Sequence, residues 1–154
     1  MQFEDRSCFA IGVFLDSEWA SRGVDALTRD GFEPQSLSIV AKQAPEVSVL
    51  AERMFGAGSG QAEIEIAGIG RAVALGPLVT TLQGEDDGLG RTGVAATIRR
   101  AGFQAHDGFI YEKLTARGGI LVAIESEPRA ADALALLHAY GGGNAAIGAW
   151  GGRV

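Results

Sequence analysis

Two segments, one near each end of the chain, show the same order of structural signals, and this order strongly constrains the fold. Each segment begins with a continuous apolar run, CFAIGVFL at 8–15 and GILVAIE at 119–125. Runs of this kind are typical of strands that are covered on both faces. A capping Ser or Asp, an amphipathic helix of about four turns, a glycine and a weaker strand follow each run. The pattern therefore predicts two β-α-β units, residues 8–42 and 119–150.

The first unit has the clearer signals. Asp16 and Ser17 can cap the helix that follows, and Gly31 stands where a helix ends. The predicted buried face of this helix carries Ala20, Val24 and Leu27. Residues 36–42 then alternate apolar and polar side chains, which predicts the second strand.

The second unit repeats this order with weaker signals. Ser126 is the expected cap, Pro128 lies in the first turn, and Gly141 ends the helix before a last strand at 144–150. Two such units are the halves of a ferredoxin-like sandwich, an α+β fold. Right-handed crossovers would place both helices on one face of a four-stranded antiparallel sheet. We expect 8–15 and 119–125 to be hydrogen-bonded neighbours at its centre.

A long, Gly-rich and partly helical insertion, residues 43–118, separates the two units. It predicts a helix that starts near Pro45, a half-exposed strand in AEIEIAG, and two short helices that end at Gly102 and Gly118. The expected buried positions are Val47, Leu50, Ala51 and Met54 in the first helix, Val94, Ile98 and Ala101 in the second, and Ile110 and Leu114 in the third. At 154 residues the whole chain, 1–154, is most simply a single domain.

Charge and cysteine content exclude several classes of function. The net charge is −6 and only two lysines occur, which disfavours nucleic acid and anionic membrane surfaces as partners. No apolar run reaches the roughly 18 to 20 residues of a membrane-spanning helix, so no membrane insertion is expected. The N-terminal MQFEDRS is unlike a signal peptide, and Cys8 is the only cysteine. A cytoplasmic location is therefore predicted.

The stretch GIGRAVALGPLVTTL, residues 68–82, follows a predicted strand as a dinucleotide-binding fingerprint does. However, Val73 stands where the third glycine should be, and Pro77 blocks the long helix that should follow. We interpret the stretch as a buried extended segment whose glycines lie where the backbone crosses another element closely, and we predict no cofactor. The alternative is a ligand-binding site formed by Gly68, Gly70, Arg71 and Gly76.

Other candidate side chains have simpler structural roles. His106, Asp107 and Glu112 could suggest a metal or acid–base site, but a helix N-cap at His106 and Asp107 explains them better. Tyr111 and Lys113 lack the spacing that would place both on one helix face. We therefore predict no catalytic residue and no metal site. The remaining candidates are expected to be structural: Cys8 as a small buried residue, His138 near a helix end, and Trp19 and Trp150 in the core or, alternatively, at an interface.

Several sequence stretches resemble the bacterial general-stress, heat-induced stress protein family. They are the opening β-α-β unit, GIGRAVALGPL, and YEKLTARGGILVAIES, and the similarity covers about residues 9–140. Gly-Pro-Leu at 76–78 and Arg-Gly-Gly at 117–119 are the best anchors, whereas the acidic QGEDDGLG and GFQAHDG depart from the family pattern. The resemblance implies a role in the stress response and supplies no catalytic residues.

Three hypotheses on function follow. The first is a non-enzymatic, stress-associated domain that self-associates as a twofold dimer, because 36–42 and 144–150 look like poorly protected edge strands. In the alternative to that dimer, the insertion covers the open edge within a monomer. The second hypothesis is a small-molecule-binding or sensory domain that uses residues 68–76. The third is an enzyme whose site is assembled from residues that sequence spacing does not reveal.

Overall fold

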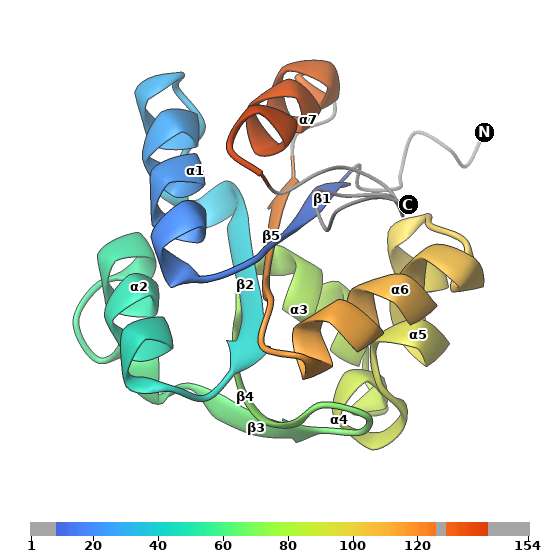
Figure 1. Cartoon of the computed structure of the whole chain (residues 1–154). Coiled ribbons are helices and arrows are strands. Elements are labelled where there is room, and N and C mark those ends of the chain that lie inside the picture. The colour runs from blue at the N-terminus through green and yellow to red at the C-terminus, as the bar shows by residue number, and fades with distance from the viewer. Residues whose placement is uncertain (1–8, 126–128, 142–154) are drawn as a thin grey trace.

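A computed structural model describes residues 9–125 and 129–141, and in it helices cover both faces of one antiparallel sheet (Figure 1). The strands are β1 (Phe9–Phe14), β2 (Leu37–Lys42), β3 (Glu63–Ile66), β4 (Gly70–Leu75) and β5 (Ile120–Glu125). The helices are α1 (Ser17–Arg29), α2 (Pro45–Phe55), α3 (Pro77–Gln83), α4 (Gly88–Thr92), α5 (Val94–Thr97), α6 (Ala105–Ala116) and α7 (Ala130–Ala139). Short 3₁₀ turns lie at η2 (Pro34–Ser36), η3 (Ser59–Gln61) and η4 (Ile98–Ala101).

The predicted pairing of the two apolar runs is confirmed. β1 and β5 are antiparallel neighbours, with Phe9 opposite Glu125 and Phe14 opposite Ile120. β5 also pairs with β2, so it lies inside the sheet, whose described strands follow the order β1-β5-β2-β4-β3. Among the described strands β1 stands at one end of this order, so only β5 has the expected position inside the sheet. The α+β class and the antiparallel sheet are thus as expected. The strand predicted at 144–150 lies outside the described residues.

The predicted number of four strands is wrong, because the insertion contributes a hairpin to the same sheet. β3 and β4 pair with each other, and β4 pairs with β2. β2 therefore lies between two strands, and its first five residues are buried, Ser38 included. The prediction that residues 36–42 form an exposed edge is consequently wrong. The edge position falls to the short strand β3, where Glu63 and Glu65 are charged, as is usual on protected edges.

The core consists of two layers, one on each face of the sheet. On the first face, α1, α2 and α7 pack against the sheet, through a cluster that includes Leu27, Leu50, Leu137, Ile39 and Val122. On the second face, α3 to α6 pack through a cluster that includes Leu78, Leu89, Val94, Ile98 and Tyr111.

Several helical predictions are confirmed in detail. The Asp16 carboxylate accepts a hydrogen bond from the backbone N–H of Trp19 at 3.0 Å and so caps α1. Gly31 follows the C-cap of α1 with a φ of +97°, a conformation that suits glycine. The predicted apolar faces of α1, α2 and of α5 with η4 are buried, at Ala20, Val24, Leu27, Val47, Leu50, Ala51, Met54, Val94, Ile98 and Ala101.

The Gly-rich stretch is extended only in its first half. Residues 70–75 form β4 as expected, but residues 77–83 are not extended and form α3, a helix of only 7 residues that begins at Pro77. Proline is well suited to that first helical position, because the N–H it lacks would have no partner within the helix. At Gly76 the predicted close crossing is confirmed, since an added Cβ would lie 2.4 Å from the Leu37 carbonyl oxygen.

Two predictions for α6 are wrong. Its most buried positions are Gly108, Tyr111 and Thr115, whereas Ile110 and Leu114 are only partly buried. The cause is Gly108, which lets α6 approach Ile98 so closely that a Cβ would lie 2.4 Å from Ile98 Cγ2.

The predicted N-cap of α6 at His106 and Asp107 is also wrong. Gln104 is the N-cap, without a side-chain hydrogen bond, and both predicted residues lie inside the first turn. Asp107 still has a favourable interaction with the helix dipole there.

Candidate functional site

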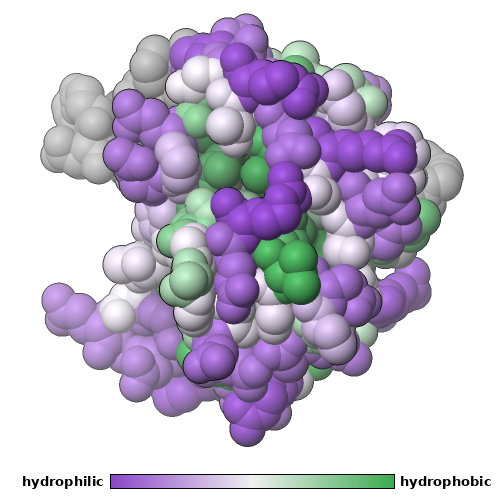
Figure 2. Space-filling view, turned by 90° about the vertical axis from the view of Figure 1, so that its left-hand side faces the viewer, coloured by the Kyte–Doolittle hydropathy of each residue, from purple (hydrophilic) through white to green (hydrophobic). Residues whose placement is uncertain are grey.

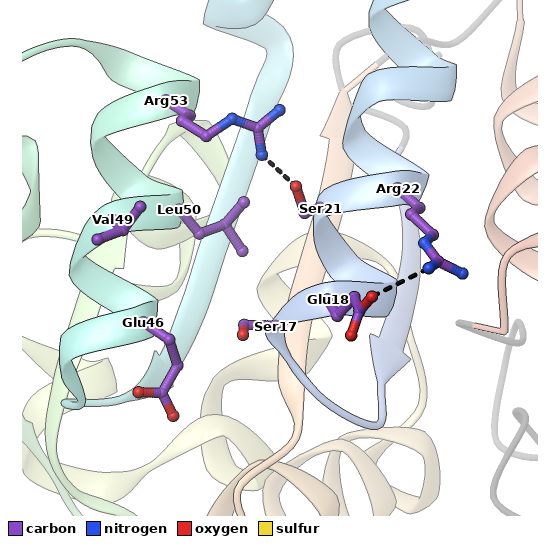
Figure 3. Close-up of a pocket in the computed structure, with 8 residues that line it drawn as sticks. All are labelled: Ser17, Glu18, Ser21, Arg22, Glu46, Val49, Leu50 and Arg53. Atoms are coloured by element: carbon purple, nitrogen blue, oxygen red, sulfur yellow. Dashed lines mark hydrogen bonds and ion pairs between the residues drawn. The ribbon is translucent and has the colours of Figure 1, made fainter.

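An open groove of about 440 Å³ lies between α1 and α2 (Figure 3). The two helices are parallel, and the sheet explains why. β1 and β2 both run antiparallel to β5, so they point the same way. Because α1 follows β1 and α2 follows β2, both helices begin at the same edge of the sheet. The residues that line the groove are Ser17, Glu18, Ser21 and Arg22 from α1, and Glu46, Val49, Leu50 and Arg53 from α2.

The floor of the groove is apolar and its rims are charged. Leu50 points from α2 toward α1 and is only 2% exposed, whereas Val49 is 60% exposed (Figure 3). Viewed from the side of α2, the surface shows apolar side chains surrounded by hydrophilic ones (Figure 2). An apolar floor within charged rims is the usual composition of a surface that binds another molecule.

The charged side chains of the groove are arranged along the helix axes, with carboxylates near the helix N-termini. Glu18 and Glu46 lie in the first turns of α1 and α2, where the positive helix ends favour carboxylates. Arg22 forms an ion pair with Glu18 at 3.0 Å. Near the other end, the Arg53 guanidinium donates hydrogen bonds to Ser21 Oγ and to Asp25. These contacts join the rims of the groove at its basic end.

A second depression, of about 320 Å³, lies beside Gly68. It is lined by Gly68, Phe109, Glu112, Lys113, Ala116 and Arg117. The Phe109 side chain is 53% exposed, and the Lys113 ammonium lies 5.3 Å from the centre of its ring. The depression thus combines an exposed aromatic ring with two cations, Lys113 and Arg117, and one carboxylate, Glu112.

Glu112 explains why position 68 is a glycine. Its carboxylate accepts a hydrogen bond from the backbone N–H of Ala95 at 3.0 Å. Added Cβ atoms at Gly68 and Gly93 would lie 2.3 Å and 2.6 Å from its oxygens, and both glycines have positive φ. The turn at Gly68 thus accommodates a carboxylate of the chain itself, which ties α6 to the β3–β4 turn and to α5.

The four candidate ligand-binding residues are not brought together. Arg71 is exposed and forms an ion pair with Glu63 at 3.3 Å across the β3–β4 hairpin. Gly70 lies nearby, with no atom within 4 Å of an added Cβ. Gly76 packs against β2 at the other end of β4, about 20 Å away at 3.3 Å per residue. Gly68 lines the depression beside α6, and the proposed ligand role of all four residues stays a prediction.

The shifted pKa values belong to structural contacts. Asp86 forms an ion pair with Arg100 at 2.9 Å, and this hydrogen-bonded guanidinium lowers the pKa of Asp86 to about 2. Arg100 also donates to the carbonyl of Leu82 at 2.8 Å, near the end of α3. Burial, with a smaller contribution from Asp107, raises the pKa of the Tyr111 phenol. Its hydroxyl and that of Thr115 are buried without a hydrogen-bond partner in the described part of the chain.

The remaining candidates are scattered. His106 lies on the surface beside Phe103, His138 is exposed in the last turn of α7, and Trp19 is 41% exposed under the Arg22 guanidinium. The expectation that Trp19 belongs to the core is therefore wrong. Cys8 and Trp150 lie outside the described residues. Within residues 9–125 and 129–141, no three His, Cys, Asp or Glu side chains are grouped to hold a metal ion, and no helix is long and apolar enough to cross a membrane.

No protein-family model, curated protein or solved structure significantly matches the chain. The resemblance to the general-stress family accordingly stays a prediction.

The α1–α2 groove is a feature that the sequence alone does not predict. Its residues come from two separate predicted helices, at 17–22 and 46–53, and no motif links them. The available signal was the position of Glu18 and Glu46 in equivalent first turns, which becomes informative only when the two helices are known to lie side by side.

Proposed function

We propose that the protein is a non-enzymatic binding domain that associates with a second copy of itself. The observation that carries the proposal is the groove between α1 and α2, in which an exposed and a buried aliphatic side chain, Val49 and Leu50, lie between charged rims. Such a surface gains free energy when apolar area is removed from water, while its charged rims supply specificity.

The pKa shifts of Asp86 and Tyr111 do not suit either group to proton transfer at neutral pH. General acid–base catalysis works best with a pKa near the operating pH. Here the pKa of Asp86 is lowered to about 2 and the pKa of Tyr111 is raised, so each group is held more firmly in its usual charge state at neutral pH. Both shifts arise from packing and ion pairing within the fold.

Light scattering and sedimentation over a wide range of concentrations test self-association. The chain has a mass of 16.0 kDa, so the average mass should rise with concentration toward twice that value. A mass that stays at 16.0 kDa up to several hundred micromolar would refute the proposal.

A role in the stress response, in the cytoplasm, is also part of the proposal. It is supported by the resemblance of GIGRAVALGPL and YEKLTARGGILVAIES to the general-stress family. Protein abundance before and after heat or oxidative stress, measured in cell fractions, tests it. Unchanged abundance under every stress tried, or recovery outside the cytoplasmic fraction, would count against it.

A ferredoxin-like arrangement of the two terminal units is proposed as well. In its support, β5 lies between β1 and β2, and α1 and α7 pack on the same face of the sheet. An experimental structure of the whole chain, including residues 144–150, decides between this arrangement and another α+β topology.

The alternative function, small-molecule binding, is favoured by the depression beside Gly68. Phe109 offers an exposed ring there, and Lys113 and Arg117 offer two cations. Calorimetric titration with NAD, ATP and GTP tests nucleotides as ligands. We expect no binding tighter than about 100 μM, about −5.5 kcal/mol, and no change in Arg71→Ala. Tighter binding that is lost in Lys113→Ala would establish the alternative function.

A further inference from the structure

The α1–α2 groove has carboxylates at one end and a guanidinium at the other, and two of these groups already have partners in the chain: Glu18 pairs with Arg22, and Arg53 pairs with Asp25. Glu18 and Glu46 lie at the end where both helices begin, and Arg53 lies toward the end where α2 finishes. Glu46 and Arg53 are seven positions apart on α2, about 10 Å along the helix. Glu46 forms no ion pair within the described part of the chain, so its carboxylate is available to a partner.

We propose that this groove binds the same groove of a second copy, in a twofold arrangement that reverses the direction of the helices. The inference rests on the proposed self-association and names its surface. A twofold interface brings one patch against itself. Reversal then places Glu46 opposite Arg53 of the partner subunit, and the same contact occurs a second time across the axis.

The helix directions favour the same arrangement. α1 and α2 are parallel, so their positive ends lie together at one edge of the sheet. A reversed partner sets its negative helix ends against these positive ends. A partner in the same direction would instead bring like charges together, which is destabilising. The helix dipoles thus favour the reversed orientation.

The area of the surface determines how tightly two copies are expected to associate. At 1.5 Å per residue the helices are about 16 to 20 Å long, and two helix diameters are about 20 Å, so the projected face is about 400 Å². Stable interfaces bury roughly 800 Å² per partner. The groove by itself should therefore support a weak dimer, whose formation depends on protein concentration and falls with ionic strength.

A charge-swap experiment tests the proposal by sedimentation velocity on the full chain. Glu46→Arg should weaken the dimer at least roughly tenfold, because two cations then face each other at both contacts. Arg53→Glu should do the same with two carboxylates, and because it also removes the contacts of Arg53 with Ser21 and Asp25 within the chain, its melting temperature is compared with that of the wild type. An equimolar mixture of the two variants should associate again, because the cation introduced at position 46 meets the carboxylate introduced at position 53.

Two further variants separate the effect of this surface from the effect of net charge. Glu85→Arg makes the same change in net charge on an exposed loop away from the groove and should leave the dimer intact. Val49→Asp is a second groove variant, which places a carboxylate in the apolar part of the surface and should also weaken association. Circular dichroism verifies that each variant is folded.

The outcomes distinguish the two proposals. A wild-type chain that is monomeric at every concentration refutes self-association itself. If the wild-type chain dimerises, and Glu46→Arg and Val49→Asp dimerise as strongly as Glu85→Arg, then the groove is not the dimer surface. Self-association itself would still stand in that case. If both single-charge groove variants are monomeric and their mixture stays monomeric, the pairing of Glu46 with Arg53 is wrong.

Discussion

The two faces of the sheet are covered in different ways. On the first face, α1, α2 and α7 have 13, 11 and 10 residues, and regular apolar faces hold α1 and α2 against the strands. On the second face, α6 has 12 residues, but α3, α4 and α5 have only 7, 5 and 4 residues, and glycines join them. Long helices leave a groove where two of them meet, whereas short ones follow the sheet closely. The first face therefore has a groove between two long helices, whereas the second depends more on close backbone contacts and carries the smaller depression beside Gly68.

The largest expected effect is at Gly76, where the second face begins. Gly76→Ala should destabilise the protein by about 4 kcal/mol, because the new Cβ would meet the Leu37 carbonyl and φ is +108°. Gly70→Ala is the matched control, since φ is +103° there but no atom lies within 4 Å. It should cost only about 1 kcal/mol. Urea denaturation measures the free energy of unfolding of both variants. Equal losses of stability would show that the positive φ, and not the contact with Leu37, determines the cost.

Helical glycines allow a direct comparison of the two faces. Gly23 of α1 lies against the ring of Phe14, and Gly108 of α6 lies against Ile98 and the backbone of Ala95. A ring can shift more easily than a backbone. We therefore expect Gly108→Ala to cost about 3 kcal/mol and Gly23→Ala about 1 kcal/mol, after the gain in helix propensity. If thermal unfolding ranks them in the opposite order, the second face is the more adaptable one.

The sequence predicts the first face better than the second for a physical reason. Periodicity places Leu27 and Leu50 correctly, because a long helix with one apolar face has a single favourable orientation. On the second face, Gly108 turns α6 by allowing close contact with Ile98, and this contact overrides the pattern of Ile110 and Leu114. A contact between two elements distant in sequence leaves no periodic signal.

Contacts between distant parts of the chain also explain which features of the sheet and of the candidate site the sequence does not predict. The apolar runs at 8–15 and 119–125 predict their own pairing, because only a strand covered on both faces is apolar throughout. The hairpin of β3 and β4 could have joined either edge, and nothing local places it beside β2. Likewise, nothing in the sequence near Gly68 indicates that Glu112, 44 positions later in the chain, lies against this turn.

A smaller effect is expected from the buried hydroxyl on the second face. Tyr111 is 1% exposed and its OH has no hydrogen-bond partner in the described part of the chain. An unsatisfied buried polar group costs about 1 kcal/mol or more, so Tyr111→Phe should raise the free energy of unfolding by about that amount. Tyr140→Phe, at a half-buried position, should change it little. A loss of stability in Tyr111→Phe would reveal a bound water at the hydroxyl.

The smallest effect concerns the exposed ion pair of Asp86 and Arg100, which closes the loop after α3. Arg100 lowers the pKa of Asp86 from 3.8 to about 2 in the folded protein. A lowered pKa means that the ion pair stabilises the fold above about pH 4, and that this contribution is lost as the pH falls toward 2. Asp86→Asn should therefore flatten the dependence of the melting temperature on pH in this range, with little change in the fold. Arg100→Lys should flatten it partly, because lysine keeps the charge and loses the paired hydrogen bonds to the carboxylate. If the wild-type chain and Asp86→Asn lose stability in parallel between pH 4 and 2, other carboxylates determine the acid transition, and this ion pair contributes nothing measurable to the second face.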